Sequence, residues 1–344
     1  MKVSIGTQIQ DGPWGGGNLF AINLSNYLTK NGNFVVYDLN DEDIDIILLT
    51  EPRKTSPSSA FTNYDVQNYI KYKNPSAIVV HRVNECDEHK DTKYINKYIA
   101  HANLSADATV FVSSWIKDLY ANKGEFLNKP NQVILAGADK SIFNLKNIKR
   151  WNKNEKVKIV THHWSDNWNK GFEIYKELDM LLNKKEYKNI FEFNFIGRLP
   201  KNLQLLNTNL IEPLSGPELA YELKKNHLYI TGSLNEPSGN HHIEAAQCGL
   251  PIMYIVSGGI KEYCDGFGVE YIKENLEERL LYTLSNYDDL TNKLESYPRN
   301  SDLMSQEFLK FFERLLDEKL QIINNRKKIL KTPIKDFIHK KFLN

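Results

Sequence analysis

Short apolar runs of strand character alternate with amphipathic stretches along most of this chain. Residues 18–30 carry apolar side chains at helical spacing, and Asn31-Gly32 follows as a stop signal. Strands are expected at 2–7, 34–37, 44–50, 77–80, 108–112, 132–135, 157–161, 191–196, 210–211, 228–231 and 252–256. Further helices are expected at 113–121, 170–182, 217–225 and from about residue 303 onwards. This alternation predicts an α/β fold in which mostly parallel sheets carry helices on both faces.

The length of the chain favours two domains rather than one. A chain of 344 residues rarely folds around a single hydrophobic core, and the polar, charged stretch 149–156 is typical of a linker between domains. We therefore expect an N-terminal domain at 1–150, a C-terminal domain at 151–302, and a terminal helix with a basic tail at 303–344.

Bulk composition narrows the class of protein. The formal net charge is +1, so no global field indicates a nucleic-acid partner, and a mean hydropathy of −0.50 is typical of a globular protein in water. The three cysteines show no metal-binding spacing. No apolar leader precedes the first strand pattern, and no apolar run reaches the ~18–20 residues that span a bilayer. We expect a cytoplasmic protein.

The segment at 236–244, EPSGNHHIE, is the most informative part of the chain. It places Glu236 and Glu244 on either side of a Pro-Ser-Gly turn that opens a helix-like run. Unpaired amides at a helix N-terminus bind phosphate, and carboxylates accept hydrogen bonds from sugar hydroxyls. A ligand with both phosphate and polyol character, such as a nucleotide-sugar, fits this segment.

The same segment carries a family resemblance. The Glu-x7-Glu pattern, followed by CGLP at 248–251 and SGGIKE at 257–262, resembles retaining glycosyltransferases of the GT-B fold, in particular glycosyltransferase family 4. The resemblance implies two Rossmann-like domains with parallel sheets facing a central cleft. It also implies a nucleotide-sugar donor on the second domain, an acceptor on the first, and a terminal helix that returns to the first domain.

The resemblance assigns roles within the 236–244 segment. Glu244 is expected to bind the ribose hydroxyls, and Glu236 to lie near the transferred sugar as a catalytic residue. Backbone amides near the helix start are expected to meet the donor, at Gly239, Asn240 and His241.

Two further donor elements are implied. The glycine loop after the first strand is expected to meet the donor diphosphate, with a flexible turn as the alternative, and comprises Gly15, Gly16 and Gly17. Lys170 matches the family's Lys-Gly element and is expected to stabilise the leaving phosphate as a catalytic cation. The family's diphosphate arginine is missing from 161–169, so His162 or His163 is expected to take part of its role, unless both pack only as loop residues.

The segment after the strand at 77–80 is the candidate acceptor side. His81 is expected as a catalytic residue, and Asn84, Glu85 and Asp87 are acceptor candidates. Alternation along an extended strand end separates His81 from Arg82, but it does not indicate which of them faces the cleft. A salt-bridged surface is the alternative interpretation of this charged run.

Metal-dependent sugar transferases use an Asp-x-Asp motif at the end of a strand, and we find none in this position. The acidic run DEDID at 41–45 resembles a charged turn that leads into a strand instead. We therefore expect no required metal and no cofactor beyond the substrate, a UDP- or GDP-linked sugar. The tail at 319–344 holds eight Lys or Arg against a single Asp, with apolar residues between them. It predicts either peripheral contact with an anionic membrane or a helix docked on the first domain.

The sequence thus predicts a retaining transferase that moves a sugar, of hexosyl type, from a nucleotide-diphosphate sugar to an acceptor hydroxyl. Surface-glycan or polysaccharide synthesis is the expected setting, with a glycan, lipid-linked or small-molecule acceptor. The alternatives are a nucleotide-sugar epimerase of the same fold and a nucleotide-sugar-binding protein that has lost catalysis.

Overall fold

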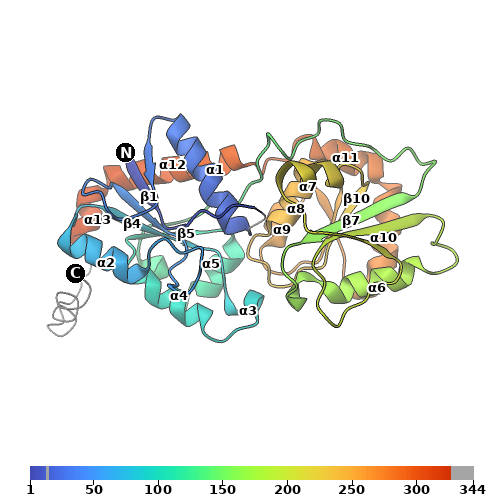
Figure 1. The fold of residues 1–344 in the computed structure, drawn as a ribbon, viewed down its shortest axis with the longest axis horizontal. Coiled ribbons are helices and arrows are strands. Elements are labelled where there is room, and N and C mark those ends of the chain that lie inside the picture. Colours follow the sequence, from blue (N-terminus) through green and yellow to red (C-terminus); the bar gives the residue numbers. More distant parts are fainter. Residues whose placement is uncertain (13–14, 327–344) are drawn as a thin grey trace.

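The computed structural model describes residues 1–12 and 15–326, and its framework is two parallel β-sheets of six strands each. Each sheet forms the centre of one half of an elongated molecule and is flanked by helices on both faces (Figure 1). The predicted α/β class, with two Rossmann-like domains, is confirmed by this arrangement.

The first sheet has the strand order β2-β1-β3-β4-β5-β6. Its strands are β1 Lys2–Ile5, β2 Phe34–Val36, β3 Ile46–Leu49, β4 Ile78–Val83, β5 Ala108–Phe111 and β6 Asn131–Val133. The helices of this half are α1 Gly16–Lys30, α2 Asn63–Tyr72, α3 Asp87–Lys90, α4 Ile95–Asn103 and α5 Ser114–Tyr120, with a short 3₁₀ turn at Phe126–Asn128.

The second sheet has the strand order β12-β11-β10-β7-β8-β9. Its strands are β7 Val157–His163, β8 Phe191–Gly197, β9 Thr208–Ile211, β10 Leu228–Thr231, β11 Ile252–Tyr254 and β12 Gly268–Glu270. The accompanying helices are α6 Phe172–Leu182, α7 Gly216–Leu223, α8 Asn240–Gln247, α9 Ile260–Cys264, α10 Leu276–Ser285 and α11 Tyr287–Leu294, with 3₁₀ turns at Trp168–Lys170 and Lys273–Asn275.

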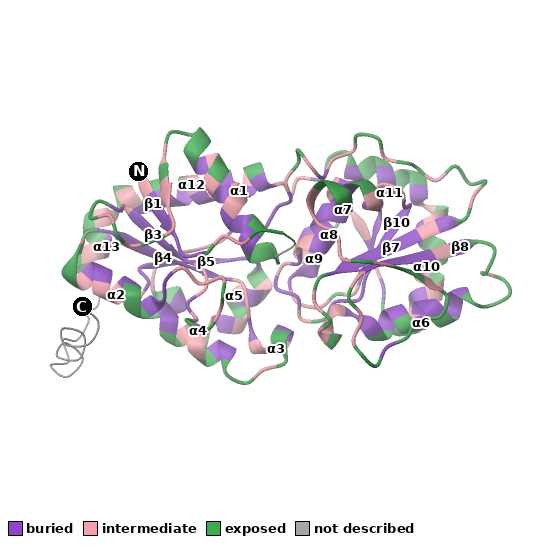
Figure 2. Ribbon diagram, viewed as in Figure 1, coloured by how far each residue is buried: buried purple, intermediate pink, exposed green. Residues whose placement is uncertain are grey.

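Central strands are buried on both faces, which explains why their sequences are almost continuously apolar. The β3 strand reads IILL and all four residues are buried, and both sheets stand out as buried layers in Figure 2. In contrast to the expected strand end at residue 80, β4 continues to Val83, because Arg82 and Val83 pair with Val110 and Phe111 of β5. The β4 extension carries His81 and Arg82 into the sheet, where their side chains point to opposite faces.

The chain returns to the first domain at its C-terminal end. Helix α12 Ser301–Asp317 packs beside α1, where the rings of Phe20 and Phe308 are 5.2 Å apart, and α13 Lys319–Asn325 follows (Figure 1). The Arg326 guanidinium then forms two hydrogen bonds, of 2.7 and 2.8 Å, with the Asp107 carboxylate. Most of the basic tail, residues 327–344, lies outside the described residues. Among the described helices, none is long and apolar enough to cross a membrane.

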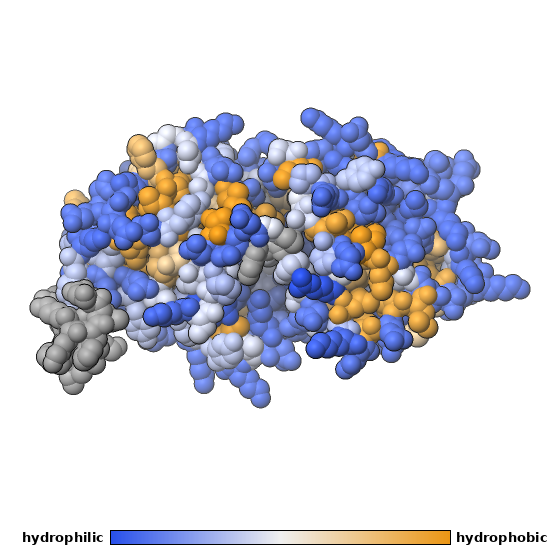
Figure 3. All heavy atoms as spheres, in the orientation of Figure 1, coloured by the Kyte–Doolittle hydropathy of each residue, from blue (hydrophilic) through white to orange (hydrophobic). Residues whose placement is uncertain are grey.

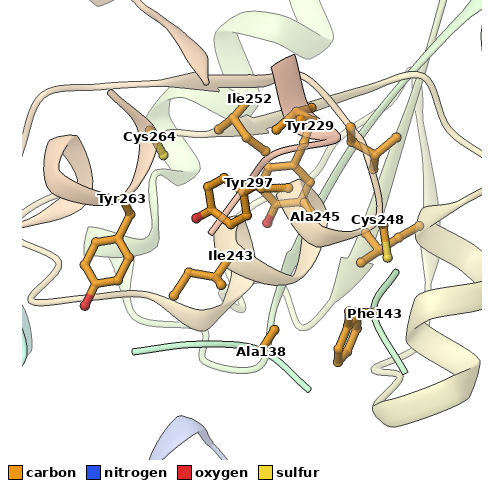
Figure 4. Close-up of a cluster of buried hydrophobic side chains, with 14 of the residues drawn as sticks. Ala138, Phe143, Tyr229, Ile243, Ala245, Cys248, Ile252, Tyr263, Cys264 and Tyr297 are labelled. Carbon is orange, nitrogen blue, oxygen red and sulfur yellow. The ribbon is translucent and has the colours of Figure 1, made fainter. Parts of the chain in front are cut away.

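The core of the second domain includes the segment that links the two domains. Ala138 and Phe143, which precede β7, are buried against Ile243 and Ala245 of α8 and against Tyr229 of β10 (Figure 4). This packing supports α8 from behind and positions the start of that helix at the carboxyl edge of the second sheet.

Candidate functional site

A cleft of about 410 Å³ lies between the carboxyl ends of the two sheets. In open parallel sheets, ligands bind where successive strands depart to opposite sides of a central strand. Here those points lie between β1 and β3 and between β7 and β10. The loops that leave these strands line the cleft, so the two topological switch points face one another. Hydrophilic side chains dominate the face of the molecule drawn in Figure 3, and apolar surface gathers in patches on both halves.

Two uncapped helix N-termini meet in the cleft. Helix α1 begins after Gly15 and α8 begins after Gly239, and neither start has a side-chain cap. A Cβ at Gly16 would lie only 2.9 Å from Nδ2 of the Asn240 side chain, so the two helix starts approach each other across the domain boundary. With no side-chain cap among the described residues, the first N–H groups and the dipoles of these helices create a positive region that suits an anionic ligand.

A buried charge cluster lies beside the start of α8. The Lys170 ammonium is 2.6 Å from one oxygen of Glu236, and His89 Nε2 is 3.7 Å from the other. Lys170 Nζ and His89 Nε2 are 3.4 Å apart. Because His89 belongs to α3 of the first domain, the cluster joins the two domains at the floor of the cleft.

The charges of this cluster control its protonation. Burial opposes ionisation of Glu236, but Lys170 and His89 outweigh that effect, and the pKa of Glu236 falls to about 2. Burial lowers the pKa of His89, and the nearby Lys170 lowers it further against the opposing pull of Glu236. At neutral pH Glu236 is therefore a carboxylate and His89 a neutral imidazole.

Glu244 lies about one turn into α8, four residues after its first residue Asn240, and is buried at 5% exposure. One of its oxygens is 2.9 Å from His162 Nε2, which comes from the end of β7. The carboxylate lines the cleft, and its second oxygen has no hydrogen bond to any other described residue. An acceptor group with spare hydrogen-bonding capacity at this position suits a ligand hydroxyl.

Two other histidines form the wall behind these carboxylates. His163 Nε2 is 2.5 Å from the Tyr175 hydroxyl, and His241 Nε2 is 2.9 Å from the Thr231 hydroxyl. Burial holds the pKa of both His163 and His241 well below the usual histidine range. Both line the cleft as neutral hydrogen-bonding groups rather than as cations.

The cleft gathers most of the residues singled out from the sequence. Those lining it are Gly15, Gly16, Gly17, Asn84, Glu85, His162, His163, Lys170, Glu236, Gly239, Asn240, His241 and Glu244. Glu85 is held by an ion pair of 2.6 Å with Arg53 and by one of 3.5 Å with Lys90.

Two sequence candidates lie outside this cleft. His81 faces the other side of the first sheet, where Nδ1 accepts a hydrogen bond of 3.2 Å from the Asn103 amide, and burial lowers its pKa to about 3. The Asp87 carboxylate accepts hydrogen bonds from the backbone amides of Ile95 and Asn96, at 2.8 and 3.1 Å. Neither lines the cleft in the structure.

Three residues that line or close the site were not assigned roles from the sequence. His89 and Arg82 come from the first domain and line the cleft. Glu262 of α9 accepts hydrogen bonds from the backbone amides of Ser114 and Trp115, at 2.8 and 3.0 Å, and so ties the second domain to the start of α5. Side chains alternate between the two faces of an extended strand, and this alternation after residue 80 was the one sequence signal for Arg82. His89 and Glu262 contact residues of the other domain, so no local pattern indicated their roles. In the described part of the chain, no group of three or more His, Cys, Asp or Glu side chains is placed to hold a metal ion.

Comparison with known proteins identifies the fold. No protein-family model matches the sequence, and no curated protein does so. Several solved structures match over 92% of this chain. They are Anabaena HepE in complex with UDP and glucose (TM-score 0.67, 12% identity, 100% of that chain), a glycosyltransferase from Rickettsia africae (0.65, 14%, 98%) and the sucrose-phosphate synthase from Thermosynechococcus elongatus (0.64, 12%, 99%). At these identities the likeness shows a shared architecture, which is the GT-B fold predicted from the sequence.

Proposed function

We propose that this protein is a retaining glycosyltransferase that transfers a sugar from a nucleotide-diphosphate sugar to an acceptor hydroxyl. The observation that carries the proposal is the arrangement around the start of α8. Two buried carboxylates, Glu236 and Glu244, flank an uncapped helix N-terminus, and Lys170 lies 2.6 Å from Glu236 in a cleft between two Rossmann-like domains. Each of these groups matches a different part of a nucleotide-sugar.

The donor occupies the second-domain side of the cleft in this proposal. Glu244 accepts hydrogen bonds from the ribose hydroxyls with its free oxygen. The diphosphate lies against the amides at the starts of α8 and α1, which stabilise anions. HepE was solved with UDP, which favours UDP over GDP as the carrier to be tested first. His163 supports the site from behind as a neutral group, because its ring is already hydrogen-bonded to Tyr175.

Lys170 and Glu236 carry the chemistry. As the glycosidic bond breaks, negative charge grows on the leaving phosphate and positive charge grows on the anomeric carbon. The Lys170 ammonium stabilises the first and the Glu236 carboxylate the second. We propose that the acceptor oxygen attacks the anomeric carbon from the face the phosphate leaves, so the anomeric configuration is kept. The bond between the anomeric carbon and the phosphate oxygen breaks, and the acceptor's hydroxyl proton passes to the departing phosphate. With this cation and two helix N-termini present, we propose that the reaction needs no metal and no cofactor.

The acceptor lies on the first-domain side, near Asn84 and Glu85. We propose a glycan, lipid-linked or small-molecule acceptor, a role in surface-glycan or polysaccharide synthesis, and a cytoplasmic location with membrane contact through the basic tail. His89 closes the reaction centre from this side, since it spans the domain boundary to Glu236 at 3.7 Å. Exclusion of water by domain closure protects the donor from hydrolysis.

A nucleotide-sugar-binding protein without catalysis is the second candidate. The observation that favours it is the Lys170–Glu236 ion pair, in which Glu236 offsets the charge that Lys170 would offer to a diphosphate. The family's diphosphate arginine is also missing between residues 161 and 169.

Incubation with UDP-glucose, UDP-galactose and UDP-N-acetylglucosamine, followed by proton NMR, separates the two candidates. A transferase releases UDP from one donor, and the first sugar anomer formed by slow hydrolysis has the α configuration of the donor. Release of the β anomer would contradict retention. Tight UDP binding without any turnover, in the presence of a mixed acceptor pool, would favour the binding protein.

A further inference from the structure

Arg82 is a buried cation at the edge of the cleft. It lies near the end of β4, is 5% exposed, and stacks on Phe20 of α1 with the guanidinium carbon 3.9 Å from the ring centroid. Its side chain belongs to the sheet face that α1 and α12 cover, opposite to that of His81. At the carboxyl edge of the sheet this face opens into the cleft, and Arg82 lines it.

Among the residues that the structure describes, Arg82 lacks the hydrogen-bonding or ionic partner that a buried guanidinium normally has. It donates no hydrogen bond to, and forms no ion pair with, any described residue. By contrast, every carboxylate and lysine side chain that lines the cleft has a polar partner. These side chains are Glu51, Glu85, Lys90, Lys170, Glu236 and Glu244. Burial lowers the pKa of Arg82 to about 10, while Tyr263 and Glu85 favour its charged form, so the cation persists at neutral pH.

A buried, unpaired charge costs stability, and such groups occur where a ligand supplies the missing partner. The surroundings of Arg82 specify the sign and shape of that ligand. The cleft wall beside it includes Thr7 and the start of α1 at Gly16 and Gly17, whose amides donate no hydrogen bond to any described residue. A planar guanidinium next to a helix N-terminus suits an oxyanion, which accepts two parallel hydrogen bonds from arginine.

We propose that Arg82 forms an anion-binding subsite on the acceptor side of the cleft, and that the acceptor carries a carboxylate or a phosphate group. This inference rests on the proposed transferase function. Arg82 belongs to the first domain, whereas Lys170 and the start of α8 belong to the second and provide positive charge for the donor phosphates. The start of α1 lies between the two, so it borders the donor diphosphate on one side and the Arg82 subsite on the other. The subsite therefore selects an acidic sugar or a phosphorylated acceptor over a neutral one.

Titration calorimetry with three probes tests the subsite: inorganic phosphate, methyl β-glucuronide and the neutral methyl β-glucoside. Each is titrated into the full-length protein with and without saturating UDP. We expect phosphate and the glucuronide to bind at least tenfold more tightly than the glucoside in the presence of UDP. The tighter of the two anions identifies which anionic group the acceptor carries.

Variants at position 82 assign that preference. Arg82→Gln is expected to weaken anion binding at least tenfold and to leave UDP affinity within twofold of the wild type. Arg82→Lys is expected to retain part of the anion affinity. Lys97→Gln, which removes an exposed cation of helix α4 in the same domain but outside the cleft, is the control and is expected to leave anion affinity within about twofold. Arg82→Met is expected to raise the melting temperature by about 2 °C, because it removes an unpaired buried charge.

Three results would overturn the proposal. The first is equal affinity for the anionic and neutral sugars, and the second is unchanged anion affinity in Arg82→Gln. The third is a loss of UDP affinity in Arg82→Gln as large as its loss of anion affinity, which would assign Arg82 to the donor site. Failure of the wild type to bind UDP at all would count against the transferase proposal instead. In that case the titrations without nucleotide still decide whether Arg82 binds anions.

Discussion

At the residue scale, the site is governed by the pairing of Lys170 with Glu236. Both side chains are largely withdrawn from water, so each charge depends on the other for compensation. The pair is costly to break yet contributes modestly when intact, which is typical of groups retained for binding or catalysis rather than for stability.

Breaking this pair from either side is expected to destabilise the fold. Lys170→Met and Glu236→Gln should each lower the free energy of unfolding by about 3 kcal/mol, because a buried charge loses its partner. Sugar transfer should fall by about 10²-fold or more in both, since each variant removes a charge that acts in the transition state. Urea unfolding and initial-rate measurements check the two effects.

The double variant separates structure from chemistry. With both charges removed, Lys170→Met/Glu236→Gln should recover most of the lost stability but none of the activity. Recovery of activity together with stability would mean that the pair is structural only.

The acid dependence of Glu236 follows from its low pKa. The pKa of Glu236 is about 2 in the folded protein, below the ordinary value of 4.5, so the ionised form contributes stability above pH 4.5. That contribution, about 3 kcal/mol, is lost as the pH falls from 4.5 to 2. Lys170→Met should shrink this acid-sensitive part of the unfolding free energy, and an unchanged profile in that variant would contradict the assigned cause.

At the element scale, the start of α8 depends on a glycine. Gly239 has a φ of +74°, and a Cβ there would lie 2.7 Å from His242 Cε1 and 2.9 Å from Glu236 Cγ. Glycine thus allows the backbone to turn into the helix while its amides stay open to the cleft.

Gly239→Ala is expected to cost about 1–3 kcal/mol of folding free energy and to weaken nucleotide binding, because the helix start must move. Gly32→Ala is the matched control. Its φ is +76°, but nothing lies within 4 Å of the added Cβ and it is remote from the cleft, so only the backbone cost applies. Nucleotide affinity equal to wild type in Gly239→Ala would remove the α8 start from the binding site.

Local sequence patterns predict some elements of the site well, whereas elements that depend on tertiary contacts are predicted less accurately. The loop and helix at 236–247 combine glycine, carboxylates and an apolar helix face within one contiguous segment, so local rules predicted their structure. The end of β4 was placed three residues too early, because the pairing of Arg82 and Val83 with β5 is a tertiary contact. His89 and Lys170 are 81 positions apart in sequence, and no local pattern indicates that they meet.

At the scale of the whole molecule, buried neutral histidines couple folding to acidity. Burial lowers the pKa of His81 and His242 to about 3 and that of His227 to about 4. Each stabilises the folded state fully above pH 6.5, the ordinary value, and that stability is lost progressively as the pH falls toward the folded pKa.

Unfolding measured from pH 8 to pH 5 is expected to show a cumulative loss, with about 2 kcal/mol from a single histidine whose pKa is about 3. His81→Gln retains a polar group for Asn103 and should reduce the slope of stability against pH by about one proton between pH 6 and pH 4. The exposed His101→Gln is the control and should leave the slope unchanged. A slope that His81→Gln does not alter would mean that His81 is protonated in the folded protein.

The most direct test of the central claim is a calorimetric titration of UDP and GDP into the wild type and Glu244→Gln. We expect one nucleotide to bind, and Glu244→Gln to weaken it by about tenfold or more, because a charge-assisted hydrogen bond to ribose is worth about 1.5–3 kcal/mol. Glu278→Gln, an exposed carboxylate of the same domain, should leave affinity unchanged. No binding by either nucleotide, or equal affinity in Glu244→Gln, would contradict the assignment of this cleft to a nucleotide-sugar.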